Sequence, residues 1–94
     1  MDEIYTYFFK SLAHRSRLKL LKLLADNEEM SVTDLTQLMD IEQSSVSRHL
    51  NILRRQGIVK VRVDGQMRYY SLNLDKIREI LDKFIKSLKT AWQR

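Results

Sequence analysis

Short polar side chains gather on one side of a segment with helical spacing, residues 43–56. Val46, Leu50 and Leu53 recur at that spacing and predict its buried side. The outward side chains are then Gln43, Ser44, Ser45, Ser47, Arg48 and Asn51. Amides, hydroxyls and a guanidinium match base edges in the major groove of DNA, and the amides at a helix start attract phosphate. This segment is therefore predicted to read double-stranded DNA, and Arg48 bridging a guanine contributes roughly 1–3 kcal/mol of discrimination.

Simpler interpretations of the same residues stay open. In one of them Gln43 only caps the helix together with Asp40, while Ser44 and Ser45 are exposed side chains without a partner. His49 has two alternatives of equal standing. It donates a hydrogen bond to a phosphate or a base, or it packs at the edge of the core between the helices.

The residues before this segment predict a partner helix. Ser31 and Asp34 have the spacing of a capping box, which begins a short helix ending near Met39. Residues 40–42 are then a tight connection, and Gly57 lies where a left-handed residue ends the second helix. Two short helices joined by about three residues, the second of them basic, form a helix-turn-helix unit.

A β-hairpin is predicted directly after this unit. Asp64-Gly65 is the strongest short hairpin signal, and it separates two alternating segments, 58–63 and 66–72. A hairpin in this position makes the winged version of the helix-turn-helix. The wing is accordingly expected over residues 58–72.

Two arginines flank the tip of this hairpin. A two-residue Asp-Gly turn sets Arg62 opposite Met67 and Arg68 opposite Val61. Both arginines are then candidates for contacts with a phosphate or the minor groove, and Gln66 is a weaker candidate. The alternative is that both arginines are solvated on a free hairpin.

Helical spacing also predicts an element at each end of the chain. Helices are expected over about 2–12, 15–25 and 75–91, in addition to the two of the helix-turn-helix. The expected fold class is mainly α (α+β): a winged helix-turn-helix with about five helices and a two-stranded hairpin. Residues 1–94 form one domain, in which residues 31–56 hold the helix-turn-helix.

An apolar stripe on the first and last helices is too long for the core of a 94-residue chain to cover. Its members are Ile4, Phe8, Leu12, Ile77, Leu81, Phe84, Leu88 and Trp92. A chain of this size buries only about 60–65% of its unfolded surface, and without cysteine no disulfide can add stability. We expect residues 1–13 and 74–92 to form the interface of a homodimer. The alternative is packing of the two helices within one chain, and both arrangements can hold together.

The distribution of charge favours nucleic acid as the partner. The formal net charge is +5, and residues 43–72 carry six basic side chains against one acidic side chain. Residues 31–42 carry three acidic side chains and no basic one. A basic cluster of this kind indicates a nucleic-acid footprint more strongly than a general role in solubility.

Other classes of function find little support in the residues. No stretch approaches the ~20 apolar residues of a membrane span, and the acidic start is unlike a secretory signal, so a cytoplasmic protein is expected. No glycine-rich phosphate loop is present, and Ser47 and His49 point to different sides of their helix. No enzymatic activity is therefore predicted.

Several motifs resemble the ArsR/SmtB family of bacterial and archaeal repressors. They are Ser11-Leu-Ala-His-Arg-Ser-Arg-Leu18, Val32-Thr-Asp-Leu35, Gln43-Ser-Ser-Val-Ser-Arg-His-Leu-Asn-Ile-Leu53, Gly57-Ile-Val59 and Gly65 to Leu72. The resemblance covers nearly the whole chain, and Val46-Ser-Arg-His-Leu50 is its most specific part. It implies a homodimer built from the first and last helices. It also implies operator binding through residues 43–49 and the wing, with release when a signal binds.

The metal sites of that family are not matched by this sequence. Its metal sensors carry a Cys-x-Cys-Asp-Leu pattern where this chain has Ser31-Val-Thr-Asp34-Leu35, and hydroxyls bind soft metals poorly. The other family site uses Asp and His pairs on the last helix, but residues 73–94 contain no histidine. No metal site and no cofactor are therefore expected.

These observations lead to a sequence-specific, dimeric repressor on a near-palindromic operator, associated with the nucleoid. A protein-interaction module of the same fold and a non-specific architectural DNA binder are the alternatives. The sequence does not decide whether regulation involves a small molecule, a partner protein or no effector at all.

Overall fold

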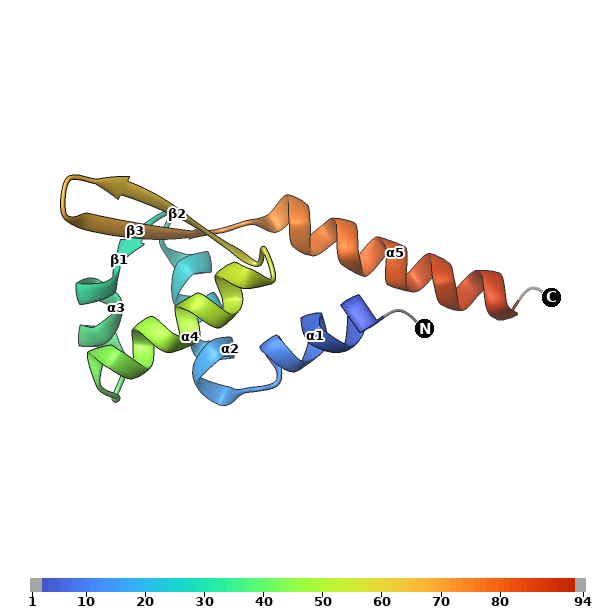
Figure 1. Cartoon of the computed structure of the whole chain (residues 1–94), viewed down its shortest axis with the longest axis horizontal. Coiled ribbons are helices and arrows are strands. Elements are labelled where there is room, and N and C mark those ends of the chain that lie inside the picture. Colours follow the sequence, from blue (N-terminus) through green and yellow to red (C-terminus); the bar gives the residue numbers. More distant parts are fainter. Residues whose placement is uncertain (1–2, 93–94) are drawn as a thin grey trace.

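Five helices and a small antiparallel sheet make up the described residues, 3–92, of the computed structural model (Figure 1). The elements are α1 (Glu3–Leu12), α2 (Arg15–Asp26), β1 (Met30–Ser31), α3 (Val32–Leu38), α4 (Gln43–Arg55), β2 (Val59–Asp64), β3 (Met67–Leu72) and α5 (Leu74–Trp92). The fold is mainly helical, with α3 and α4 as the helix-turn-helix and β2 and β3 as the wing. The predicted helices and the hairpin are confirmed, with ends that differ by about one residue.

The sheet has a third strand that the sequence did not predict. The strand order is β1-β3-β2, and Met30 pairs with Tyr70 while Ser31 pairs with Tyr69. Two residues are too few to show an alternating pattern, so nothing in the sequence marks β1 as a strand. Its position matters because β1 leads directly into α3 and so ties the wing to the helix-turn-helix.

The predicted register of the hairpin is wrong. Asp64 stays in the strand and pairs with Met67, so the two loop residues are Gly65 and Gln66. Gly65 has a φ of +62°, and no described residue other than glycine has a positive φ, which is the pattern of a type II′ turn. Only the first loop residue then needs glycine, whereas the predicted turn has its glycine second.

This shift changes the partners of both wing arginines. Arg62 lies opposite Tyr69, and Arg68 lies opposite Val63. The predicted partners, Met67 and Val61, are therefore incorrect. Paired residues share a face, so the two arginines lie on opposite faces of the wing.

The core lies where α2, α3 and α4 meet, under the base of the sheet. Its fully buried side chains include Leu20, Leu35, Val46, Leu50, Leu53 and Ile58. The three residues predicted as the inner side of the second helix are thus confirmed as buried. Their packing fixes the rotation of α4 about its axis and leaves its polar side outward.

α5 extends from the body and gives the molecule extents of 52 × 23 × 21 Å (Figure 1). It is anchored by Phe84, whose ring lies edge-on to Tyr5 and Phe9 of α1, with centroids 5.3 and 4.9 Å away. The expectation that α1 and α5 pack within one chain is therefore confirmed. No helix in the described part of the chain is both long and apolar enough to cross a membrane.

The capping box at the start of α3 is present as predicted. The Asp34 backbone N–H donates to Ser31 Oγ at 3.1 Å, and the Ser31 N–H donates to Asp34 Oδ2 at 3.3 Å. At the end of α4, Gly57 has a φ of +74°. Local hydrogen bonds and one left-handed residue thus delimit the helix-turn-helix at both ends.

Replacing Ser31 with alanine is expected to lower the free energy of unfolding by about 1 kcal/mol, because it removes the cap of α3. Urea denaturation followed by circular dichroism measures this loss. Gln37→Ala, an exposed substitution on the same helix, is the control and should change stability little. Equal stability of Ser31→Ala and the wild type would show that the cap does not stabilise the fold.

Candidate nucleic-acid interface

The polar side of α4 is open to solvent. Gln43, Ser44, Arg48 and Asn51 are exposed, whereas Ser45 and Ser47 are half-buried at the margins of this side. Among the described residues, none of these side chains makes a hydrogen bond or an ion pair within the chain. A helix surface of unpaired donors and acceptors is suited to hydrogen bonding with an external polar ligand.

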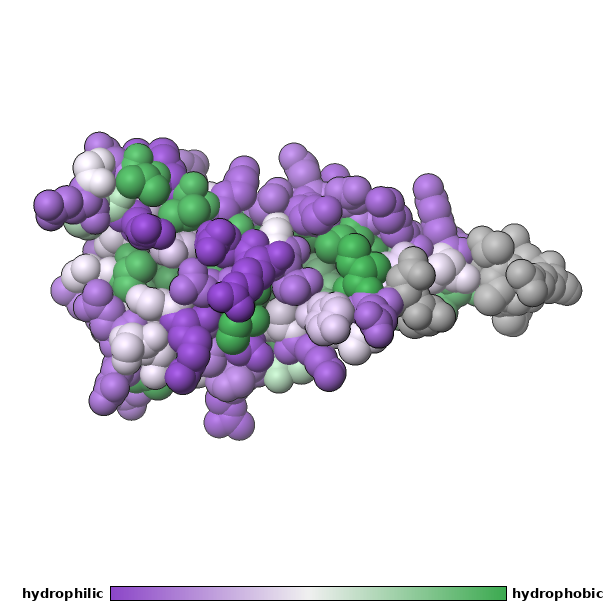
Figure 2. Space-filling model, viewed as in Figure 1, coloured by the Kyte–Doolittle hydropathy of each residue, from purple (hydrophilic) through white to green (hydrophobic). Residues whose placement is uncertain are grey.

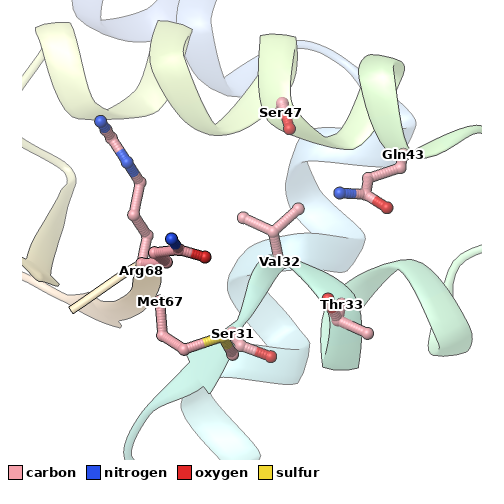
Figure 3. A pocket seen from close by; sticks show the side chains of 8 residues that line it. Ser31, Val32, Thr33, Gln43, Ser47, Met67 and Arg68 are labelled. Atoms are coloured by element: carbon pink, nitrogen blue, oxygen red, sulfur yellow. The ribbon is translucent and has the colours of Figure 1, made fainter. Parts of the chain in front are cut away.

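A cleft of about 250 Å³ lies between α4, the start of α3 and the wing (Figure 3). Its lining residues are Ser31, Val32, Thr33, Gln43, Ser47, Gln66, Met67 and Arg68. Gln43 and Ser47 point into it from α4, and Arg68 extends from the wing toward α4 (Figure 3). The cleft thus joins candidate residues of α4 to candidate residues of the wing, which lie at least 19 positions further along the sequence.

The first turn of α4 presents free backbone amides. Glu42 is the N-cap residue, and no side chain caps the helix, so Gln43 and Asp40 do not act as its cap. The Ser45 and Val46 N–H groups donate to the Glu42 carbonyl, which leaves the two preceding amides without an intrahelical acceptor. These amides and the positive end of the helix dipole favour an anion at this end of α4.

His49 packs inside the chain, which favours the second of its two alternatives. His49 is 6% exposed, and the centroid of its ring lies 4.5 Å from that of His14. Arg17 Nη1 donates to His49 Nδ1 at 3.2 Å, which makes this nitrogen an acceptor. Arg17 Nε also donates to the Ser11 carbonyl at 2.6 Å. His49 is thus part of a hydrogen-bonded connection between α1, α2 and α4, and its side chain is not on the surface with Arg48.

The surroundings of His49 lower its pKa. Burial has the largest effect, because it penalises the charged imidazolium. Electrostatic repulsion from His14, Arg17 and Arg48 lowers the pKa further. Neutral His49 is therefore the form that the fold accommodates.

The two wing arginines differ in their surroundings. Arg68 is exposed and lines the cleft, without an intramolecular ion pair in the described residues. Arg62 forms a two-bonded ion pair with Glu29, at 3.0 and 2.8 Å. The sequence predicted the same role for both, because nothing in it shows that Glu29 lies beside Arg62.

The apolar stripe predicted for a dimer is only partly exposed. Phe8 is fully buried in the core of its own chain, so its predicted place at a subunit interface is wrong. Leu12, Ile77 and Phe84 are half-buried, while Ile4, Leu81 and Leu88 are exposed. The side chain of Trp92 lies outside the described residues.

Two exposed aliphatic residues on α5 were not in the predicted stripe. Leu74 and Ile85 are 64% and 49% exposed, and they line a shallow groove of about 370 Å³ together with Ile77, Arg78, Leu81 and Asp82. Figure 2 shows hydrophobic surface on α5 beside α1, within a largely hydrophilic exterior. The helical repeat of α5 places Leu74, Leu81 and Ile85 next to the residues that face α1. The position of α1 in the structure is needed to separate these exposed residues from the ones that pack against α1.

No group of three or more His, Cys, Asp or Glu residues within the described part of the chain is placed to hold a metal ion. His14 and His49, which are 35 positions apart in the sequence, lie together in the structure. Two imidazoles without a further ligand are fewer than zinc sites use.

A helix pair with an exposed polar second helix, joined to a hairpin wing, defines the chain as a winged helix-turn-helix protein. A model described as "Bacterial regulatory protein, arsR family" matches residues 14–61. The chain belongs to this ArsR family, whose members are DNA-binding transcriptional regulators.

Named relatives agree with this assignment. An uncharacterized HTH-type transcriptional regulator of Methanocaldococcus jannaschii is 40% identical over 73 residues, which is 78% of this chain and 82% of the relative. The transcriptional activator HlyU of Vibrio cholerae is 36% identical over 73 residues, 78% of this chain and 67% of the relative.

Solved structures show the same fold over nearly the whole chain. The crystal structure of Rv0081 from Mycobacterium tuberculosis has a TM-score of 0.72 at 35% identity, and the alignment covers 97% of this chain and 91% of that chain. In sequence, the aligned part spans 65% of the full mycobacterial relative.

Acidification is expected to destabilise the fold through His49. Its folded pKa is below the unfolded value of about 6.5, so the unfolded chain binds the proton more readily. Stability is thus unaffected by this group well above pH 6.5, and it falls as the pH drops from about 6.5 until the lowered pKa is passed.

The midpoint temperature of thermal unfolding, measured from pH 7.5 to pH 5, tests this effect. In the His49→Gln variant this midpoint should depend less on pH than in the wild type. Parallel curves for the two proteins would assign the pH dependence to other groups.

Proposed function

We propose that this protein acts as a homodimeric, sequence-specific repressor on a near-palindromic DNA site, in the cytoplasm of a bacterium or archaeon. The observation that carries the proposal is the unpaired polar side of α4 next to a cleft with Arg68. No intramolecular hydrogen bond or ion pair engages these side chains within the described residues, whereas DNA supplies partners for all of them.

In this proposal α4 enters the major groove. Ser44, Arg48 and Asn51 are exposed, follow one another at helical spacing and contact base edges. Gln43, Ser45 and Ser47 contact the margins of the groove. His49 is left out of this set because its ring is buried against His14 and Arg17.

Phosphate contacts come from two directions. The free amides at the start of α4 meet one phosphate, and Arg68 with Gln66 meets the backbone from the wing. Because the cleft lies between these two groups, a sugar–phosphate strand that follows it contacts both.

The dimer is supported by the position of α5. This helix extends beyond the body, and four of its apolar residues are exposed: Leu74, Leu81, Ile85 and Leu88. A second copy that covers this side supplies the burial that a 94-residue chain lacks. Two-fold symmetry then spaces the two α4 helices by about one turn of DNA, which requires a near-palindromic site.

Regulation by a thiolate-bound metal does not fit this chain. Ser31 and Thr33 stand where the metal sensors of the family carry cysteines, and Ser31 is already used as the cap of α3. A relative from Synechocystis is named a transcriptional repressor SmtB homolog, while HlyU is named an activator. Repression is proposed because a dimer seated across an operator blocks access to it.

The DNA-binding proposal is tested by fluorescence anisotropy with a selected near-palindrome and a random duplex at two salt concentrations. The selected site is expected to bind about 10³-fold more tightly or better. Arg48→Ala should remove most of that margin, because it removes a base contact on each protomer. Arg68→Ala should weaken both duplexes alike and reduce the salt dependence.

Equal affinity for both duplexes, with a steep salt slope, would point to an architectural DNA binder. The absence of binding even at low salt would leave the protein-interaction module as the remaining function.

Ile85→Glu is expected to convert the dimer to a monomer, since it places a charge within the apolar side of α5. Sedimentation equilibrium should give twice the chain mass of 11.3 kDa for the wild type and the single mass for the variant. Leu38→Glu is the matched control, because Leu38 is similarly exposed, at 51%, but lies on α3. A monomeric wild type at micromolar concentration would contradict the proposed dimer.

A further inference from the structure

Arg62 is engaged on the outer face of the wing by three neighbours. Its Nε and Nη2 donate to Oε2 and Oε1 of Glu29 at 3.0 and 2.8 Å. Its Nη1 lies 3.8 Å from Oδ2 of Asp64, and its Cζ lies 4.6 Å from the centroid of the Tyr69 ring. Both edges and one face of the guanidinium are thus occupied within the chain.

The strand pairing shows which parts of the fold this contact joins. Arg62 on β2 lies opposite Tyr69 on β3, and Tyr69 lies opposite Ser31 on β1. Arg62 therefore reaches over the middle strand to Glu29, which directly precedes β1. Since β1 runs into α3 at Val32, the contact fastens the far strand of the wing to the start of the helix-turn-helix.

Arg68 has the opposite surroundings. It pairs with Val63 on the other face of the wing, and it lines the cleft together with Gln43 and Ser47 of α4. Its side chain makes no hydrogen bond or ion pair in the part of the chain that the structure describes. One wing arginine is therefore held inside the fold, and the other is available to a ligand.

We infer that Arg62 is a positioning residue that sets the angle of the wing against α4 through its two bonds to Glu29, while Arg68 is the wing arginine that meets DNA phosphate. This inference rests on the proposed DNA binding. A fork of two parallel hydrogen bonds fixes direction as well as distance, which a lysine in the same place would not do.

The ion pair acts on geometry more than on stability. The side chains of Arg62 and Glu29 are 54% and 33% exposed, and exposed ion pairs contribute little to the free energy of unfolding. The hydrogen bond from Arg62 lowers the pKa of Glu29, so the pair stays ionised at the neutral pH of a DNA-binding assay. Loss of the pair is expected to loosen the wing without unfolding the chain.

The test compares Glu29→Gln, Arg62→Gln and the double variant in titrations of the selected near-palindrome against salt. Each single variant should weaken binding about two- to fivefold for each bound wing. The interaction free energy of an exposed ion pair corresponds to no larger factor in affinity. The double variant should be no weaker than either single variant, since all three remove the same ion pair. The salt slope should equal that of the wild type.

Two further variants separate positioning from phosphate binding. Arg62→Lys keeps the charge but removes the fork, so it should weaken binding about as much as Arg62→Gln. Arg68→Gln should lower the salt slope by about 0.9 for each phosphate that Arg68 neutralises in the wild type.

Tighter binding by Glu29→Gln would overturn the inference, because it would mean that Glu29 withholds Arg62 from DNA. A reduced salt slope in Arg62→Gln, with full affinity in Arg62→Lys, would overturn it in the same way.

A wild type that binds neither duplex would refute the proposed function. The positioning role is then tested by amide hydrogen exchange in β2 and β3. Glu29→Gln and Arg62→Gln should both exchange faster there than the wild type, by similar factors, while circular dichroism shows an intact fold. Unchanged exchange in the wing would overturn the inference independently of DNA.

Discussion

Burial of the apolar side of α4 is the constraint on which the rest of the structure depends. Val46, Leu50 and Leu53 are fully buried among α2, α3 and the base of the sheet. A rigid helix held on one side has no freedom to rotate, so the opposite side is presented at a fixed angle. Three properties of the candidate interface follow from this: which polar residues of α4 are exposed, where its first turn points, and which of its residues border the cleft.

The wing is placed by contacts at both of its sides. β3 pairs with the two-residue strand β1, and Arg62 binds Glu29 just before that strand. Because β1 continues directly into α3, its pairing with β3 links the wing to the start of the helix-turn-helix. A small chain thereby holds the two elements that are proposed to bind DNA in a defined relation, without a large core between them.

α5 has two distinct apolar sides with different roles. Phe84 packs edge-on to rings of α1, and Ile80 is buried, so one side belongs to the fold of the single chain. Leu74, Leu81 and Ile85 lie on the neighbouring side and line an open groove. The helix is thus both a brace for α1 and the surface that a second copy is proposed to cover.

The sequence by itself determined the elements, because their signals are local: helical spacing around Val46, the capping box of Ser31 and Asp34, and the glycine of the turn. Family membership and the polar side of α4 followed from the same local patterns.

Only the tertiary structure decided the short strand β1, the hairpin register and the different surroundings of Arg62 and Arg68. It also placed His49 inside the chain and Phe8 in the core. These features depend on contacts between residues far apart in the chain, such as Glu29 with Arg62 and His14 with His49. Periodicity along the sequence shows which side of an element is apolar, but it does not show what that side meets.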